Sequence, residues 1–320
     1  MKTILYTVAK NSDGDLVKAS DADKVSSYFC PICNNDLTLR KSGKTDFNSK
    51  RPHFAHKTLT PNCTPETVLH FAFKNLLAKK IQYHIDNSLP LNFSWECNYC
   101  SEPHSGNLLK KIRKVYVEYN LTFCQPDIVL FDKDDKVFGV IEIVVTHKPE
   151  ENVLKYYEDN NIILIQINLT SDQDIDKLES EVLKANTVTT CLNPKCSKCG
   201  HFQHKTKIII IDSSCWKCNK PMKVAIMEDC LERGSTCIGP DKFTDIEIES
   251  ARSKGVIIKE HYSKTIGEKY LANTCSHCGT FIGEFYLIEH LSLASDGELT
   301  SKTFDEGYHC KHCISIIDDL

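Results

Sequence analysis

The sequence has no apolar run of about eighteen residues or more, which is the length that a helix needs to cross a bilayer. The first apolar stretch is short, turns polar within a few residues and has no small-residue cleavage site, so it does not resemble a signal peptide. From these two absences we expect a cytoplasmic protein without a membrane partner.

An excess of charge of one sign is also missing. Lys and Arg total 39, Asp and Glu total 43, and the formal net charge is −4. A general electrostatic attraction to nucleic acid is therefore excluded, and any such binding must use local basic patches. A chain of 320 residues with 41% hydrophobic residues is long enough for two or three domains with buried cores.

Cysteine, by contrast, is abundant. The chain has 17 cysteines, and most of them lie in C-x-x-C pairs. In a cytosolic protein thiols stay reduced, so such pairs indicate metal ligands rather than disulfides. Two intervening residues let both thiolates reach one zinc ion at about 2.3 Å. The pairs are Cys30/Cys33, Cys97/Cys100, Cys196/Cys199, Cys215/Cys218, Cys275/Cys278 and Cys310/Cys313.

The last four pairs predict two consecutive zinc ribbons. Cys196/Cys199 and Cys215/Cys218 are separated by 15 residues, a ribbon spacing, and residues 205–212 between them predict a strand. Cys275/Cys278 would pair with Cys310/Cys313, because the insert at 281–304 is long enough for a strand and a loop.

The first two pairs need single ligands from elsewhere. Cys30 and Cys33 are followed by Cys63 and two histidines, which predicts a Cys3His site with His56, or alternatively His53. The candidate partners of Cys97 and Cys100 are His104 and Cys191, and because Cys191 lies close to Cys196, the two sites can also share the pool Cys191, Cys196 and Cys199. We therefore expect three or four structural zinc ions. The isolated Cys124, Cys230 and Cys237 are interpreted as ordinary buried cysteines.

The middle of the chain predicts an α/β core. Thr64 is a good N-cap and Pro65 suits the first position of a helix over 64–86. Runs of β-branched, aromatic and apolar residues then predict strands. A helix connects the last two of these strands, which favours their parallel pairing in the sheet. The expected elements are strands at 114–123, 126–131 and 137–145, a helix at 150–159, a strand at 162–169 and a helix at 172–185.

Two carboxylates lie on adjacent strands of this core, Asp127 and Glu142. Each is costly to bury in such apolar surroundings unless it is paired or binds a metal. On a hairpin the two can converge on one Mg²⁺ ion, which takes one or two carboxylates, activates water and neutralises phosphate charge. Taken singly, Glu142 could be a solvent-facing edge residue and Asp127 a turn residue after Pro126.

The long helix carries Glu66, His70 and Lys74 at four-residue intervals, so these side chains share a face. This stripe is either a solvated face with ion pairing, or it directs Glu66 towards the same metal with Lys74 nearby as a cation.

These residues carry a resemblance to a known family. The motif YFCPICNNDLTLR…RPHFAHK…C, followed by the helix with Glu66, resembles the CoiA-like competence protein family. PDIVLF…VIEIVV resembles the PD-(D/E)xK nuclease superfamily, to which that family belongs, and the resemblance covers about residues 1–170. It implies an α/β (α+β) restriction-endonuclease-like core preceded by an N-terminal zinc-binding module; the C-terminal zinc ribbons, predicted from their cysteine spacing, lie outside the resemblance. It also implies a Mg²⁺- or Mn²⁺-dependent DNA nuclease for DNA processing, in competence-like handling or in defence.

One position departs from the motif. Val144 stands where the superfamily pattern has a lysine that helps to orient or activate the attacking water. Lys74 from the helix, or His147 and Lys148 just past the strand, are candidates to replace it. The same departure favours the alternative that the chain is a non-catalytic zinc-ribbon adaptor, binding nucleic acid or protein with a degenerate core. A zinc enzyme is disfavoured, since catalytic zinc keeps one position open and these sites have four protein ligands.

The predicted domains are an N-terminal zinc module at 1–63, the core at 64–188, a ribbon at 189–240 and a second zinc domain at 241–320. Two basic clusters can neutralise DNA phosphates in a salt-sensitive way, or are solvated loop charge. The expected contacts are Arg51 and Lys57 on the first module and Lys110, Lys111, Arg113 and Lys114 before the first core strand.

Overall fold

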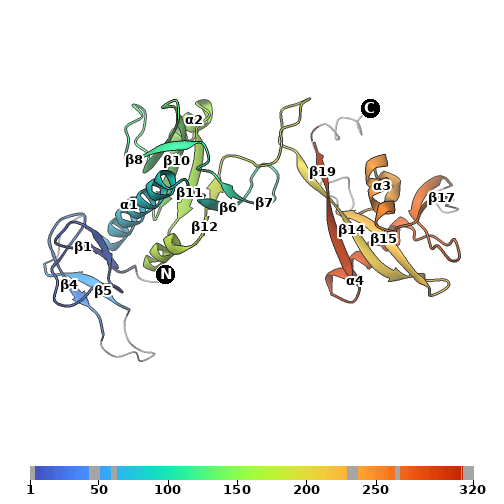
Figure 1. Ribbon diagram of the computed structural model, residues 1–320, viewed down its shortest axis with the longest axis horizontal. Coiled ribbons are helices and arrows are strands. Elements are labelled where there is room, and N and C mark those ends of the chain that lie inside the picture. The colour runs from blue at the N-terminus through green and yellow to red at the C-terminus, as the bar shows by residue number, and fades with distance from the viewer. Residues whose placement is uncertain are drawn as a thin grey trace. The chain divides into compact units, whose positions relative to one another are not determined.

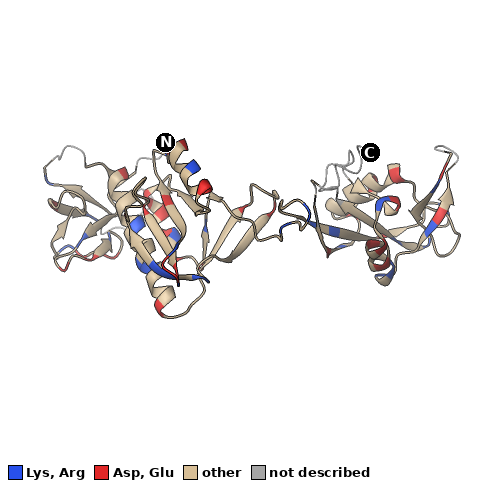
Figure 2. Ribbon diagram, turned by 90° about the horizontal axis from the view of Figure 1, so that it is seen from above, with Lys and Arg blue, Asp and Glu red and all other residues tan. Residues whose placement is uncertain are grey.

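The computed structural model describes residues 4–42, 51–58, 63–228, 237–263, 267–310 and 312. The chain forms two compact units, Met1–Cys191 and Leu192–Leu320, and both are mixed α+β with most of the regular structure in sheets (Figure 1). Acidic and basic residues are intermingled on both units, as the near-balanced composition predicts (Figure 2). Among the described helices, none is long and apolar enough to cross a membrane.

The chain begins with a small antiparallel sheet of order β2-β1-β3-β4-β5. Its core contains Ala9, Tyr28 and the fully buried Phe54, and the last two rings pack 5.1 Å apart. The strands are β1 (Val8–Lys10), β2 (Leu16–Lys18), β3 (Tyr28–Phe29), β4 (Asp36–Arg40) and β5 (His53–His56).

The long helix α1 (Pro65–Asp86) follows this sheet, as the sequence predicts. The hydroxyl of Thr64 accepts a hydrogen bond from the Thr67 N–H at 3.2 Å, which satisfies one of the open donors of the first turn. Leu69, Phe73 and Leu77 form its buried face, and α1 packs beside β8 and β10 of the central sheet.

The central sheet has the order β13-β11-β10-β9-β8. β9 and β10 form the predicted antiparallel hairpin, and β11 runs parallel to β10 after the crossover helix α2, again as predicted. The bounds are β8 (Ile112–Val117), β9 (Ile128–Asp132), β10 (Val137–Val144), α2 (Glu151–Asp159), β11 (Ile163–Asn168) and β13 (Thr187–Val188).

Two expected elements of this unit are wrong in extent or type. The strand expected at 114–123 ends at Val117, because Glu118 and Thr122 adopt positive φ angles of 51° and 75° and turn the chain. The helix expected at 172–185 is a shorter 3₁₀ helix, η1 (Asp172–Glu179), after which Ser180 is extended. The residues after it form the strand β12 (Val182–Lys184) instead. β12 belongs to a small sheet of order β12-β6-β7, whose other strands are β6 (Asn92–Glu96) and β7 (Pro103–Asn107).

The C-terminal unit is built on a sheet of order β16-β15-β14-β19, with a separate hairpin β17-β18. β14 contains the strand expected at 205–212, and its isoleucines alternate between two cores, Ile208 and Ile210 in one and Ile209 and Ile211 in the other. The strands are β14 (His204–Ser214), β15 (Pro221–Glu228), β16 (Cys237–Ile238), β17 (Ile258–Tyr262), β18 (Lys269–Asn273) and β19 (Ser301–His309).

The helices of this unit include one within the insert between Cys275/Cys278 and Cys310. The insert at 281–304 holds not only a strand and a loop, as expected, but also a helix, since Leu287, Leu291 and Ala294 recur at helical spacing and pack on the second core. The helices are η2 (Pro240–Lys242), α3 (Asp245–Ser253), η3 (Glu284–Tyr286) and α4 (Leu287–Ser295).

Candidate functional site

One backbone turn recurs at all five C-x-x-C pairs whose residues the structure fully describes. In each turn, the N–H of the residue after the second cysteine donates to the carbonyl of the first cysteine, at 2.8–3.0 Å. That residue has a positive φ of 53–77°. Positive φ is tolerated best by glycine and asparagine, so the glycine or asparagine after four of these pairs was a sequence signal that we missed; Ser101 is the exception. The residues are Asn34, Ser101, Gly200, Asn219 and Gly279.

The N-terminal module gathers Cys30, Cys33, His56 and Cys63 within ligand distance of one another. The Sγ atoms of Cys30 and Cys63 are 3.3 Å apart, and His56 Nε2 lies 3.3 Å from Cys33 Sγ. Ligands about 2.3 Å from a tetrahedral zinc ion are separated by about 3.5–3.8 Å, so this geometry fits the ion. The alternative ligand, His53, instead places Nδ1 2.8 Å from the carbonyl oxygen of Arg51.

A second group lies beside the central sheet. Cys97, Cys100, His104 and Cys191 converge, and all four are buried. His104 Nε2 lies 3.4 Å from Cys100 Sγ and 3.2 Å from Cys191 Sγ. Both candidate partners named from the sequence therefore meet this pair, and Cys191 is not shared with the neighbouring ribbon.

The C-terminal pairs combine differently from the two consecutive ribbons expected. Cys215 and Cys218 meet Cys275 and Cys278, with Sγ–Sγ distances of 3.6 and 3.7 Å. The predicted partner pair, Cys196/Cys199, lies at the other end of β14. An extended strand of 11 residues is about 36 Å long, so it keeps the two pairs apart rather than joining them.

The remaining pair is completed by the antiparallel partner of β14. His204 at the start of β14 is opposite His309 at the end of β19, and this register brings Cys196 and Cys199 to Cys310. Cys199 Sγ and Cys310 Sγ are 3.3 Å apart. Cys313, the remaining residue of that pair, lies outside the described residues, as does Cys230. Of the other two cysteines expected to be buried, Cys237 is buried and Cys124 is half-buried.

The two carboxylates of the central sheet lie near the end of the β9–β10 hairpin. Ile128, the first residue of β9, is paired with Ile141, so Asp127 directly precedes the paired strand next to Glu142. On the next strand, Gln166 is the partner of Glu142.

Asp127 is held by a network of donors at the start of β9. Its Oδ2 accepts the backbone N–H of Ile143 at 2.8 Å and lies 3.0 Å from His70 Nε2, while Oδ1 is 3.2 Å from Lys74 Nζ. Burial opposes ionisation, but His70, the Ile143 N–H and the Lys74 charge hold the pKa of Asp127 below its ordinary value. Asp127 is therefore a carboxylate near neutral pH.

Glu142 has the opposite electrostatic character. Burial, together with the nearby charge of Asp127, raises the pKa of Glu142 to about 7, although the Tyr157 hydroxyl donates to its Oε1 at 2.6 Å. Such a pair of neighbouring carboxylates is stabilised by a divalent cation, and Mg²⁺ needs only one or two protein carboxylates beside its waters. Among the described residues, however, neither Asp127 nor Glu142 belongs to a group of three or more candidate metal ligands, unlike the cysteines of the groups above.

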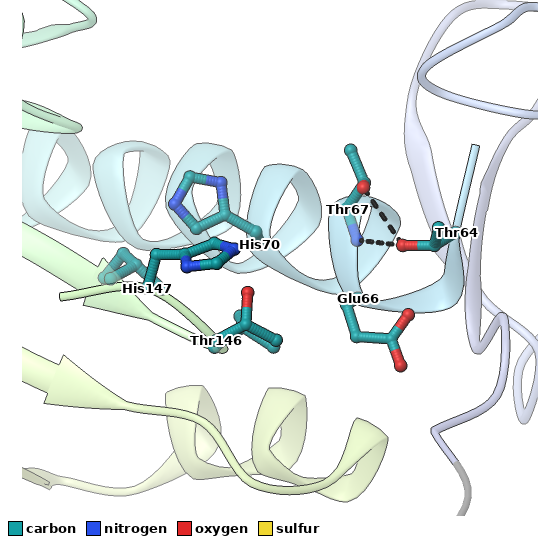
Figure 3. A pocket seen from close by; sticks show the side chains of 8 residues that line it. Thr64, Glu66, Thr67, His70, Thr146 and His147 are labelled. Atoms are coloured by element: carbon teal, nitrogen blue, oxygen red, sulfur yellow. Dashed lines mark hydrogen bonds between the residues drawn. The ribbon is translucent and has the colours of Figure 1, made fainter. Parts of the chain in front are cut away.

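A pocket of about 460 Å³ lies on the other side of His70. α1 contributes Glu66 and His70, and the end of β10 and the residues after it contribute Ile143, Thr146 and His147 (Figure 3). Ile143 alternates with Glu142 along the strand and so points to the opposite face. The structure therefore brings Lys74 to Asp127, whereas Glu66 and His147 line the neighbouring pocket.

The residues expected to bind DNA differ in whether they already form ion pairs within the protein. Arg51 forms an ion pair with the buried Asp172, at 2.9 Å, and Lys57 pairs with Asp36 at 3.0 Å. On the second cluster, Lys114 pairs with Asp135 at 2.6 Å. Lys110, Lys111 and Arg113 are exposed on or beside β8.

Comparison with known proteins gives one match. Residues 14–65 match the family model described as the N-terminal domain of competence protein CoiA, a region that includes Cys30, Cys33, His56 and Cys63. No curated protein and no solved structure matches the chain significantly.

Proposed function

We propose that the chain is a divalent-metal-dependent DNA nuclease with a competence-related role. The match at residues 14–65 supports placing it in the CoiA-like competence protein family, whose name gives that role. The observation that supports the proposal is the proximity of the two carboxylates at the β9–β10 hairpin, where Ile128 pairs with Ile141 and the charge of Asp127 helps to raise the pKa of Glu142. The proposed fold of this part is a restriction-endonuclease-like core, supported by the order α1-β8-β9-β10-α2-β11, with β6 and β7 inserted after the helix.

Asp127 and Glu142 would hold the Mg²⁺ or Mn²⁺ ion. When bound, such an ion lowers the pKa of a water molecule and neutralises charge on the scissile phosphate. His70 and the Ile143 N–H fix the orientation of the Asp127 carboxylate, and the Tyr157 hydroxyl fixes that of Glu142. These contacts hold both carboxylates in place before substrate arrives.

Lys74 is our candidate for the role of the missing motif lysine. Val144 occupies the motif position, and Lys74, which is 3% exposed, reaches Asp127 from α1 instead. Its ammonium also lies 2.6 Å from Glu118 Oε1. A cation held between two carboxylates at this site can orient a water molecule or a phosphate oxygen.

The test is incubation of the purified, zinc-loaded protein with plasmid and linear DNA, with and without Mg²⁺ or Mn²⁺. Asp127→Asn and Glu142→Gln should each reduce cleavage about a hundredfold or more, equivalent to ~3 kcal/mol in the barrier. Asp159→Asn, an exposed carboxylate on α2, is the matched control and should cleave like the wild type. Metal-dependent cleavage that survives Asp127→Asn would refute the site.

A second candidate function is a zinc-rich nucleic-acid-binding adaptor. Two observations favour it: Val144 occupies the position of the motif lysine, and Lys74 forms an ion pair with Glu118. In this alternative, Lys74 does not take the role of the motif lysine. Salt-sensitive DNA binding, with no metal-dependent cleavage of any of these substrates, would select this alternative.

A further inference from the structure

Exposed aromatic side chains gather on the face of the central sheet that carries Glu142. On the edge strand β8, Tyr116 is paired with Val129 and Lys114 with Phe131, so both side chains share the face of Val129 and Phe131. The connection from β8 to β9 adds Tyr119 and Phe123. We call Tyr116, Tyr119 and Phe123 the aromatic strip.

The rings of this strip are about half open to solvent. Tyr116 and Tyr119 lie 5.6 Å apart, and both pack edge-on against Phe131. Phe123 stacks on Tyr156, with ring centroids 4.9 Å apart and planes 18° from parallel. The exposed fractions of Tyr116, Tyr119 and Phe123 are 46%, 43% and 55%, which is unusual for large rings within eight residues of one another in the chain.

The strip leads to the carboxylates. Phe123 is stacked on Tyr156, Tyr156 contacts Tyr157 at 6.2 Å, and the Tyr157 hydroxyl donates to Glu142. At the other end, β8 carries Lys114, with Arg113, Lys111 and Lys110 exposed just before it. Exposed basic residues and exposed rings therefore adjoin each other on and beside β8, and the buried Tyr157 links Phe123 and Tyr156 to Glu142.

We infer that this surface binds single-stranded DNA, with unpaired bases stacked on the aromatic strip and phosphates neutralised at the start of β8. Aromatic rings beside basic side chains are the means by which proteins hold single strands without reading sequence. In a duplex the base faces are covered by their neighbours, so exposed rings favour unpaired bases. The inference names the substrate form for the proposed nuclease and rests on that function for its cleavage step, but the binding step is tested separately.

The measurement is the fluorescence anisotropy of a labelled oligothymidylate, and of a blunt duplex of the same length, titrated with the full zinc-loaded chain. No Mg²⁺ or Mn²⁺ is added, so that binding is observed without cleavage. We expect the single strand to bind more tightly than the duplex. Equal or tighter binding of the duplex would overturn the inference.

Variants locate the binding surface. Phe123→Leu and Tyr119→Leu keep apolar packing but remove the stacking plane, and each should weaken single-strand binding about tenfold. Tyr83→Leu, which removes a ring that is 59% exposed on α1 and whose ring contact is His84 rather than a strip residue, is the matched control and should bind normally. Wild-type affinity in both strip variants would refute the assignment.

Two further outcomes separate this inference from the proposed function. Lys111→Gln should weaken binding at low salt and reduce the slope of log affinity against log salt by about one. If the strip variants lose single-strand binding while the wild type never cleaves DNA, the binding surface stands and the nuclease proposal fails. If cleavage depends on Asp127 but the strip variants bind single strands like the wild type, the nuclease proposal stands and the binding surface fails.

Discussion

The two units use the same cysteine turn but complete their metal groups in different ways. In the N-terminal unit, each group joins one C-x-x-C turn to a histidine on a strand, His56 on β5 or His104 on β7, and to one further cysteine. In the C-terminal unit, one group joins two complete turns, and the other joins a turn to Cys310 from a second pair.

This difference explains which pairings are predictable. A turn that needs a histidine has few partners nearby, and the ligands of the N-terminal unit were among the candidates named from the sequence. Four similar C-x-x-C turns can be paired in several ways, and the closest pairs in sequence are not the ones that meet. The strands decide, because the length of β14 separates its ends and the antiparallel register of β19 returns the chain to its start.

The largest effect is expected from breaking the all-cysteine group. Cys278→Ser should remove one zinc ion and cost the C-terminal unit several kcal/mol, since binding energy at a structural zinc site is folding energy. Adding Cys215→Ser should then cost little more, because both residues serve one site, whereas Cys278→Ser and Cys199→Ser should add. Zinc content and urea unfolding measure both. Additive costs for Cys215→Ser and Cys278→Ser would contradict the crossed pairing.

The N-terminal module offers a matched pair of histidines. His56→Ala should lower the zinc content by one ion per chain, whereas His53→Ala should leave it unchanged and cost only about 1 kcal/mol, the value of one hydrogen bond. The readout is metal analysis of both variants beside the wild type. Loss of zinc in His53→Ala but not in His56→Ala would show that His53, and not His56, is the zinc ligand.

The central sheet shows how far such reasoning reaches. Three features follow from local sequence patterns, each a cap residue or a short run of one periodicity. They are the N-cap of α1, the β9–β10 hairpin and the parallel pairing of β11 with β10. The end of β8 at Val117 does not, since positive φ at Glu118 is not visible in a run as β-rich as residues 114–123. The strand β12 was missed because Val182 pairs with Asn92, far away in sequence.

The acidic site shows the same limit. The hairpin that brings Asp127 near Glu142 follows from local spacing, but the hydrogen bond from Tyr157 and the contact between Lys74 and Asp127 depend on tertiary packing. The aromatic strip was likewise hidden within a segment expected to be a plain strand.

Lys74 allows an intermediate effect to be measured within the N-terminal unit. Lys74→Met should lower the free energy of unfolding by about 2–3 kcal/mol, because it leaves Asp127 without its buried cationic partner. Lys79→Met, on the same helix but 66% exposed, should stay within about 0.5 kcal/mol of the wild type. A Lys74→Met protein as stable as the control would show that the ion pair contributes no net stability.

The smallest effect concerns the entry into α1, the helix that carries His70 and Lys74. Thr64→Ala should destabilise the unit by about 1 kcal/mol because the Thr67 N–H loses its acceptor, whereas Thr64→Ser should retain nearly all of the stability. Thermal unfolding of the three proteins decides, and equal losses in both variants would exclude capping as the cause.

The central claim is that Asp127 and Glu142 share one exchangeable divalent cation. Electron paramagnetic resonance of Mn²⁺ titrated into the zinc-loaded protein measures this without any DNA. One bound Mn²⁺ per chain in the wild type, displaced by excess Mg²⁺ and strongly weakened by both Asp127→Asn and Glu142→Gln, is the predicted result. Mn²⁺ binding that is absent in the wild type, or unchanged in both variants, would contradict the account.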